Sequence, residues 1–272
     1  RLYWLPYTFA VDTWVAANDD FDHAGISIEE LQERLQKLGS ERPPFESFVT
    51  SEWLIGWYSR FALGKFVDPP SAACSFDSPE FSAALQMCKD WGQSGGTETL
   101  GQRCVLEFEN IQDIIRIGTI GELYHDNYCY VGFPTSSGNG SMFELLSCFA
   151  ISAQGDKQEA AWEFIRFALG NLQPDGLLGV GIPASQSALD ERLQFLIETG
   201  QTFLEFTHKI KPSDADAFRA LIENTSMVEN SEQGILKIIT DESVSFFTGS
   251  KTASEAAALI QNRVQLYLME NR

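Results

Sequence analysis

The chain has 272 residues, of which 44% are hydrophobic and 21% are charged, which is typical of a globular protein and excludes disordered and collagen-like chains. Its 19 Lys and Arg residues stand against 38 Asp and Glu residues, and the net charge of −19 repels phosphate backbones and anionic lipid surfaces. We therefore expect no nucleic-acid partner.

Helix signals are clear near the start of the chain. Ser27 and Glu30 form a capping box, and leucines follow at helical spacing, which predicts a helix over 28–38. A broad aromatic face predicts a second helix over 51–63, ended by Gly64.

The middle of the chain alternates helices with short apolar runs. Pro79, placed where its missing amide hydrogen costs nothing, predicts the first turn of a third helix. Apolar runs predict strands over 104–108, 128–133 and 145–152, and a helix is predicted over 157–169. Strands followed by helices indicate an α/β lobe with additional helices.

The remainder of the chain is predicted to be mostly helical. Ser213, with Asp216 three residues later, predicts the start of one helix, and an apolar pattern predicts another over 235–247. Thr252 and Glu255 form a second capping box that opens a final helix. The Gly/Ser-rich stretch 136–141 and the glycine-rich stretch 176–181 are predicted loops, because the latter lacks the strand and helix of a dinucleotide site.

No residue pattern predicts a metal or a cofactor. The five cysteines are at least 14 positions apart and the three histidines lack metal-ligand spacing, so the cysteines are expected to be small buried hydrophobes. Trp57 and Trp162, each on a helical face, are expected to be core residues rather than ligand-stacking ones. A carboxylate set of Glu107, Glu109 and Asp113 would suit glycoside hydrolysis and leaves a hydrolase as an alternative.

Several segments, in the same order from end to end, resemble the extracellular solute-binding proteins of ABC importers, the family that includes maltose-binding protein. The segments are 5–13, 65–68 with 74–81, 131–135 with 149–153 and 159–167, 181–185, and 246–264. The resemblance implies the periplasmic-binding-protein-like (type II) fold: a C-terminal lobe over 8–146 and 186–272, with crossing strands and part of the N-terminal lobe over 1–7 and 147–185. It also implies that most of the N-terminal lobe is not in this chain.

The same resemblance implies a non-enzymatic protein that captures a small solute between two lobes and delivers it to permease subunits of an ABC transporter. A sugar or oligosaccharide is the leading ligand class. The implied location is the outer cell surface of a Gram-positive bacterium, through a lipoprotein anchor outside this chain. No cofactor is implied.

Ligands of open α/β sheets lie beyond strand ends, so the resemblance places candidate ligand-binding residues on the crossing strands and strand-end loops. These candidates are Tyr7, Phe9, Asp12, Asn110, Gln112, Asp113, Phe143 and Glu144. The loop after the Glu107 strand often carries an aromatic sugar-stacking residue in sugar-binding members of the family, whereas this chain has Asn110, Ile111 and Gln112 there. A non-catalytic protein-interaction module, with a flat apolar surface in place of a cleft, is the other alternative.

Overall fold

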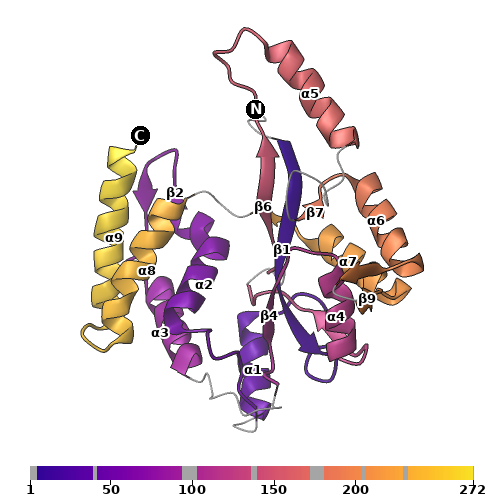
Figure 1. Ribbon diagram of the computed structural model, residues 1–272. Helices are drawn as coiled ribbons and strands as arrows, with labels where there is room; N and C mark the ends of the chain where they lie inside the picture. Colours follow the sequence, from indigo (N-terminus) through magenta and orange to yellow (C-terminus); the bar gives the residue numbers. More distant parts are fainter. Residues whose placement is uncertain are drawn as a thin grey trace. The chain divides into compact units, whose positions relative to one another are not determined.

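The computed structural model of the protein describes residues 5–38, 42–93, 103–135, 140–171, 181–203, 206–228 and 232–271 (Figure 1). The chain forms two compact units, which we call the sheet unit (1–26 with 108–229) and the helical unit (27–107 with 230–272). These boundaries differ from those of the predicted lobes, 8–146 with 186–272 and 1–7 with 147–185. The division into lobes stays a prediction.

A mixed sheet with the strand order β10-β6-β1-β4 is the centre of the sheet unit, and β5 and β7 also pair with β1. β1 runs antiparallel to β5, β6 and β7, while β10 runs parallel to β6. The strands are β1 (Leu5–Ala17), β4 (Glu107–Ile111), β5 (Tyr128–Tyr130), β6 (Met142–Phe149), β7 (Ile182–Pro183) and β10 (Met227–Val228).

From Phe9 to Val15, beyond the register shifts near its start, the odd-numbered residues of β1 face a helical core. Phe9, Val11 and Val15 pack in one cluster with side chains of α4 (Ile115–Leu123), α6 (Gln186–Glu198) and α7 (Pro212–Asn224). Side chains alternate between the two faces of a strand, so the even-numbered residues of β1 point to the opposite face. The sequence pattern thus divides β1 into a core-facing set and a second set that includes Asp12.

The sheet unit also contains α5 (Gln158–Asn171) and the hairpin of β8 (Gln201–Phe203) and β9 (Phe206–His208). Trp162 on α5 is 44% exposed, so the prediction that it belongs to the core is wrong. Among the described side chains of this helix, Ile165 and Ala168 are buried, and Trp162, three residues before Ile165, lies at the exposed end of the same face.

Five helices and a two-stranded ladder make up the described part of the helical unit. They are α1 (Ile28–Leu38), α2 (Ser51–Phe66), α3 (Pro79–Gln93), α8 (Gln233–Phe247) and α9 (Ala253–Glu270), with β2 (Val67–Asp68) and β3 (Ala73–Cys74). Both α2 and α9 pack against α3 and α8 (Figure 1). Because α2 is apolar on most of its surface, it occupies the centre of this packing, and Trp57 is buried there as expected.

The predicted capping box of α9 is confirmed, and at α1 the structure shows the serine half of the predicted box. The Glu30 backbone N–H donates to Ser27 Oγ at 3.0 Å, and the Thr252 backbone N–H donates to a Glu255 carboxylate oxygen at 2.8 Å. That hydrogen bond and the one from the Thr252 hydroxyl lower the pKa of Glu255. These helices were predictable because residues three positions apart determine where they begin.

Other predicted boundaries were wrong. α2 continues through Gly64 to Phe66, because the Val67 backbone N–H still donates to the Leu63 carbonyl. α7 begins at Pro212, one residue before the predicted Ser213, since the Asp214 carboxylate accepts the Lys211 backbone N–H at 2.9 Å and Lys211 is the N-cap.

Two helices of the sheet unit, α4 and α6, had no individual prediction. Of the predicted loops, 136–139 and 176–180 lie outside the described residues.

All five cysteines are free. The expectation of buried hydrophobes is confirmed for Cys88 and Cys104, whereas Cys148 is exposed and Cys74 and Cys129 are half-buried. Within the described ranges, no helix has both the length and the apolar character that crossing a membrane requires.

Replacing Leu193 of α6 with Ala tests the helical core of the sheet unit. Leu193 is fully buried, so L193A should lower the free energy of unfolding by about 2–5 kcal/mol through lost burial and a residual cavity. Phe195, on the same helix, is 44% exposed, and F195A should cost less than about 1 kcal/mol although it removes a larger side chain. Urea unfolding followed by circular dichroism measures both; equal losses would contradict the packing described for α6.

Candidate ligand-binding site

A cluster of polar side chains lies on three adjacent strands of the sheet unit. Asn110 on β4 donates both amide hydrogens from Nδ2, one to Asp12 Oδ1 on β1 at 2.5 Å and one to Glu144 Oε2 on β6 at 3.0 Å. Gln112, just beyond β4, donates from Nε2 to Asn110 Oδ1 at 2.5 Å. We call Asp12, Asn110, Gln112 and Glu144 the polar cluster.

Strand register brings this cluster together. Glu144 is the partner of Ala10 across the β1–β6 ladder, and Asp12 is the partner of Met142, so Asp12 and Glu144 are diagonal neighbours on one face. The small side chain of Ala10 leaves space above β1 in which side chains of the flanking strands can meet. Asn110 therefore bridges two carboxylates that stand on different strands.

The cluster has hydrogen-bonding capacity beyond its internal bonds. An amide supplies two donors, and Asn110 uses both on carboxylates, which determines the orientation of its side chain. Within the described part of the chain, Glu144 Oε1 makes no hydrogen bond, and the Gln112 side chain is exposed. Asp12 is only 6% exposed, so the outer members of the cluster, Glu144 and Gln112, are the ones that can reach a ligand.

The predicted site residues Phe9 and Phe143 lie on the other face of the sheet. Their rings make an edge-to-face contact at 5.2 Å between centroids, and both pack in the helical core. The structure therefore separates these two aromatic residues from the polar cluster. Their side chains contribute to the core.

Tyr7 and Asp113 are the remaining predicted site residues. Tyr7 lies edge-to-face against Phe149 at 5.7 Å, and burial raises the pKa of its hydroxyl. Asp113 Oδ1 accepts the backbone N–H of Ile115 at 3.0 Å, which stabilises the first turn of α4. Neither residue makes a hydrogen bond to the polar cluster.

Two of the three carboxylates of the hydrolase alternative, Glu107 and Glu109, are held in ion pairs. Glu109 is buried and accepts two hydrogen bonds from Arg116 of α4, at 2.8 and 2.5 Å. Glu107 accepts two from Arg103, of which that from Nε measures 2.9 Å. Sequence reasoning missed both arginines; Arg103 lies four residues before Glu107, but nothing in the pattern separates this pair from other surface charges.

The polar cluster has too few ligands for a metal site. Among the described residues, no group of three or more His, Cys, Asp and Glu side chains converges in a way that could hold a metal ion. Asn110 also occupies the space between the two carboxylates of the cluster. Recognition of hydroxyl and amide groups is what this arrangement can do.

Comparison with known proteins gives the fold. Neither a family model nor a curated protein matches the sequence. Among solved structures, the cyclic α-maltosyl-1,6-maltose binding protein from Arthrobacter globiformis is 14% identical, with a TM-score of 0.58 over 98% of this chain and 72% of that chain. An ABC substrate-binding protein from Listeria monocytogenes, in complex with cycloalternan, is 13% identical, with a TM-score of 0.59 and the same coverage.

The chain has the fold of ABC-transporter solute-binding proteins. The predicted periplasmic-binding-protein-like fold is thereby confirmed. A de novo designed cysteine esterase also has this fold, with 16% identity, a TM-score of 0.62, and coverage of 100% of this chain and 73% of that one. The fold by itself is therefore compatible with both binding and catalysis.

Changing Asn110 to Asp tests the bridge between the two carboxylates. N110D preserves shape but replaces a donor with a third negative charge, so we expect a loss of about 1–3 kcal/mol in the free energy of unfolding at pH 7. The loss should shrink on acidification, because protonated carboxyl groups neither repel nor need the donor. Denaturant unfolding of N110D and of the unchanged protein, at pH 7 and pH 4, measures this loss of unfolding free energy.

Asn262→Asp is the matched control for N110D, because it adds the same charge at an exposed position of α9. N262D should change stability by less than about 0.5 kcal/mol at either pH. A pH-independent loss in N110D would show that the amide does not act by bridging charges.

Proposed function

We propose that this protein is the solute-binding component of an ABC transporter and that it captures a sugar or oligosaccharide. The polar cluster carries the proposal, because it presents carboxylate and amide groups on one sheet face of a fold shared with solute-binding proteins. Two of these neighbours are described as binding a cyclic maltose derivative and cycloalternan, both of which are carbohydrates.

The chemistry of the cluster favours a neutral polyhydroxylated ligand. Carboxylate oxygens accept hydrogen bonds from hydroxyl groups, and charge-assisted bonds of this kind are about twice as strong as neutral ones. An anionic ligand would instead meet Asp12 and Glu144 in a chain whose net charge is −19. The Gln112 amide adds a group that both donates and accepts.

The proposed role is binding without catalysis. Glu107 and Glu109 are each paired with an arginine, which disfavours a free acid and base flanking a scissile bond. In this role the two lobes close over the solute about a hinge, and the closed form is recognised by the permease subunits. The protein works outside the cytoplasmic membrane, held at the cell surface by a lipid anchor.

Isothermal titration calorimetry against neutral mono- and oligosaccharides tests the proposal, with amino acids and short peptides as control ligands. At least one saccharide should bind, and E144A should weaken it about 10- to 100-fold, because the ligand loses a charged acceptor. E191A, at an exposed position of α6, is the control and should leave the affinity within about twofold.

Three results would contradict the proposal. Saccharide binding that survives E144A unchanged would place the ligand away from the polar cluster. Hydrolysis products in the incubated saccharide, detected by mass spectrometry, would favour the hydrolase. If the folded protein binds no saccharide, the protein-interaction module becomes the better interpretation.

A further inference from the structure

The polar cluster has many more free hydrogen-bond acceptors than donors. Both hydrogens of Asn110 Nδ2 are used within the cluster, one on Asp12 and one on Glu144. Asn110 Oδ1 accepts one hydrogen, from Gln112, and an amide oxygen has two acceptor positions. Asn110 can therefore accept a further hydrogen bond from a ligand but has no hydrogen left to donate.

Glu144 adds acceptors only. Its Oε2 takes one hydrogen from Asn110, and Glu144 makes no other hydrogen bond and no ion pair with the residues that the structure describes. An ionised carboxylate has about four acceptor positions and no donor. Because a ligand that covers Oε1 must replace the hydrogen bonds that water makes there, Glu144 requires a ligand that donates hydrogens.

Gln112 supplies the one donor that the described contacts of Asn110, Glu144 and Gln112 leave for a ligand. One hydrogen of its Nε2 is donated to Asn110 Oδ1 at 2.5 Å, and Gln112 makes no other hydrogen bond with a described residue. This bond turns the nitrogen toward Asn110, while the side chain as a whole is exposed. The second hydrogen and both acceptor positions of Oε1 are then available to a ligand.

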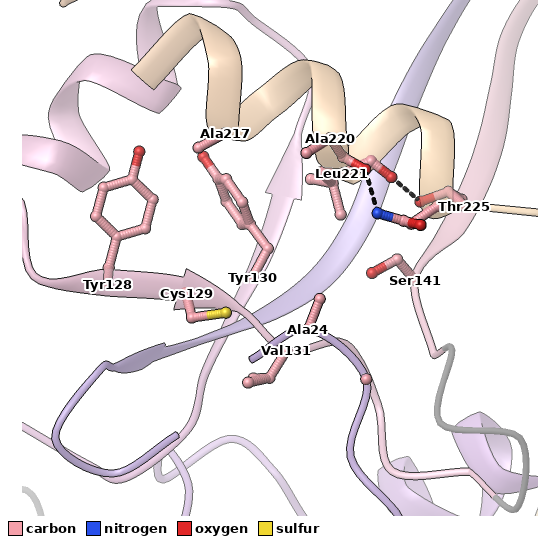
Figure 2. Close-up of a pocket in the computed structure, with 12 residues that line it drawn as sticks. Ala24, Tyr128, Cys129, Tyr130, Val131, Ser141, Ala217, Ala220, Leu221 and Thr225 are labelled. Atoms are coloured by element: carbon pink, nitrogen blue, oxygen red, sulfur yellow. Dashed lines mark hydrogen bonds between the residues drawn. The ribbon is translucent and has the colours of Figure 1, made fainter. Parts of the chain in front are cut away.

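A cavity between β5 and α7 has a different character (Figure 2). Its volume is about 190 Å³, its lining residues are uncharged, and none of them belongs to the polar cluster. Thr225 Oγ1 and Asn224 Nδ2, which line it, donate to backbone carbonyls of α7 at 2.7 and 2.9 Å, as the dashed lines in Figure 2 show. These groups are already engaged, so the recognition of hydroxyl groups belongs to the polar cluster.

We infer that the polar cluster selects a saccharide by the hydrogens of its unsubstituted hydroxyl groups and rejects sugars whose hydroxyls are methylated or acylated. This inference rests on the proposed capture of a sugar and narrows its ligand class. A free hydroxyl gives a hydrogen to Glu144 or Asn110, whereas an ether or ester oxygen can only accept. A substituted sugar would therefore cover the acceptors of the cluster and leave them unpaired.

Calorimetric titration with two neutral oligosaccharides tests the inference. Maltotriose and xylotriose are the probes, and each is compared with the same sugar after methylation of every hydroxyl. At least one unmodified sugar should bind, and its methylated form should bind at least about 100-fold more weakly, because ether oxygens cannot donate to Glu144 or Asn110.

The variant E144Q separates the loss of hydrogens from the added size of the methyl groups. Its remaining side-chain oxygen must accept from Asn110 Nδ2, so the new amide nitrogen takes the place of Oε1 and donates. An ether oxygen can accept this hydrogen, so the affinity ratio of unmodified to methylated sugar should fall about tenfold. E191Q, at an exposed position of α6, is the matched control and should leave the ratio unchanged.

Each contrary result has its own meaning. Methylated sugar that binds within about threefold of the unmodified form would overturn the inference and leave the proposed capture of a sugar intact. An unchanged ratio in E144Q would also overturn it, since the methyl groups would then be excluded by their size. If neither probe binds the folded protein in either form, the proposed function fails, and this inference fails with it.

Discussion

The long strand β1 is the constraint on which the sheet unit depends. Its 13 residues pair with β5, β6 and β7 and lie next to β4, so every strand of the sheet except β10 adjoins it. Because side chains alternate with a period of two, a shift of one residue would exchange the two faces. Val11 would then leave the helical core and Asp12 would enter it. The register of β1 therefore determines both the core and the polar cluster.

The polar cluster shows how a binding surface can be held rigid before any ligand arrives. Two carboxylates on neighbouring strands repel each other unless a donor lies between them, and Asn110 supplies both hydrogens from one nitrogen. Gln112 then donates from Nε2 to the side-chain carbonyl oxygen of Asn110 and so orients the Asn110 amide. Asp12, Asn110 and Glu144 are attached to strands, whose positions are more precise than those of loops, so these side chains have little entropy left to lose on binding.

Local signals made the helices and the fold class predictable, whereas the site required tertiary information. The caps of α1 and α9 depend on residues three positions apart, and the sequence contains them complete. By contrast, Asn110 and Asp12 are 98 positions apart, and only strand order brings them together. Phe9 and Phe143 were grouped with Asp12 and Glu144 as site residues, although strand periodicity alone places neighbours on alternate faces. Trp162 shares a helical face with the buried Ile165 and Ala168, and helical spacing alone does not tell that burial ends before Trp162.

The two faces of the sheet therefore carry two different kinds of chemistry. On the even-numbered face, carboxylates and amides compete with water for hydroxyl groups, which suits a ligand that is itself well hydrated. On the odd-numbered face, Phe9, Val11 and Val15 pack against the helices, and this apolar contact excludes water. Within β1, Asp12 belongs to the first set, and Phe9, Val11 and Val15 belong to the second. Since sites without shared partners usually contribute additively to free energy, a substitution in the helical core should lower stability without changing the hydrogen bonds of the polar cluster, unless it displaces β1 itself.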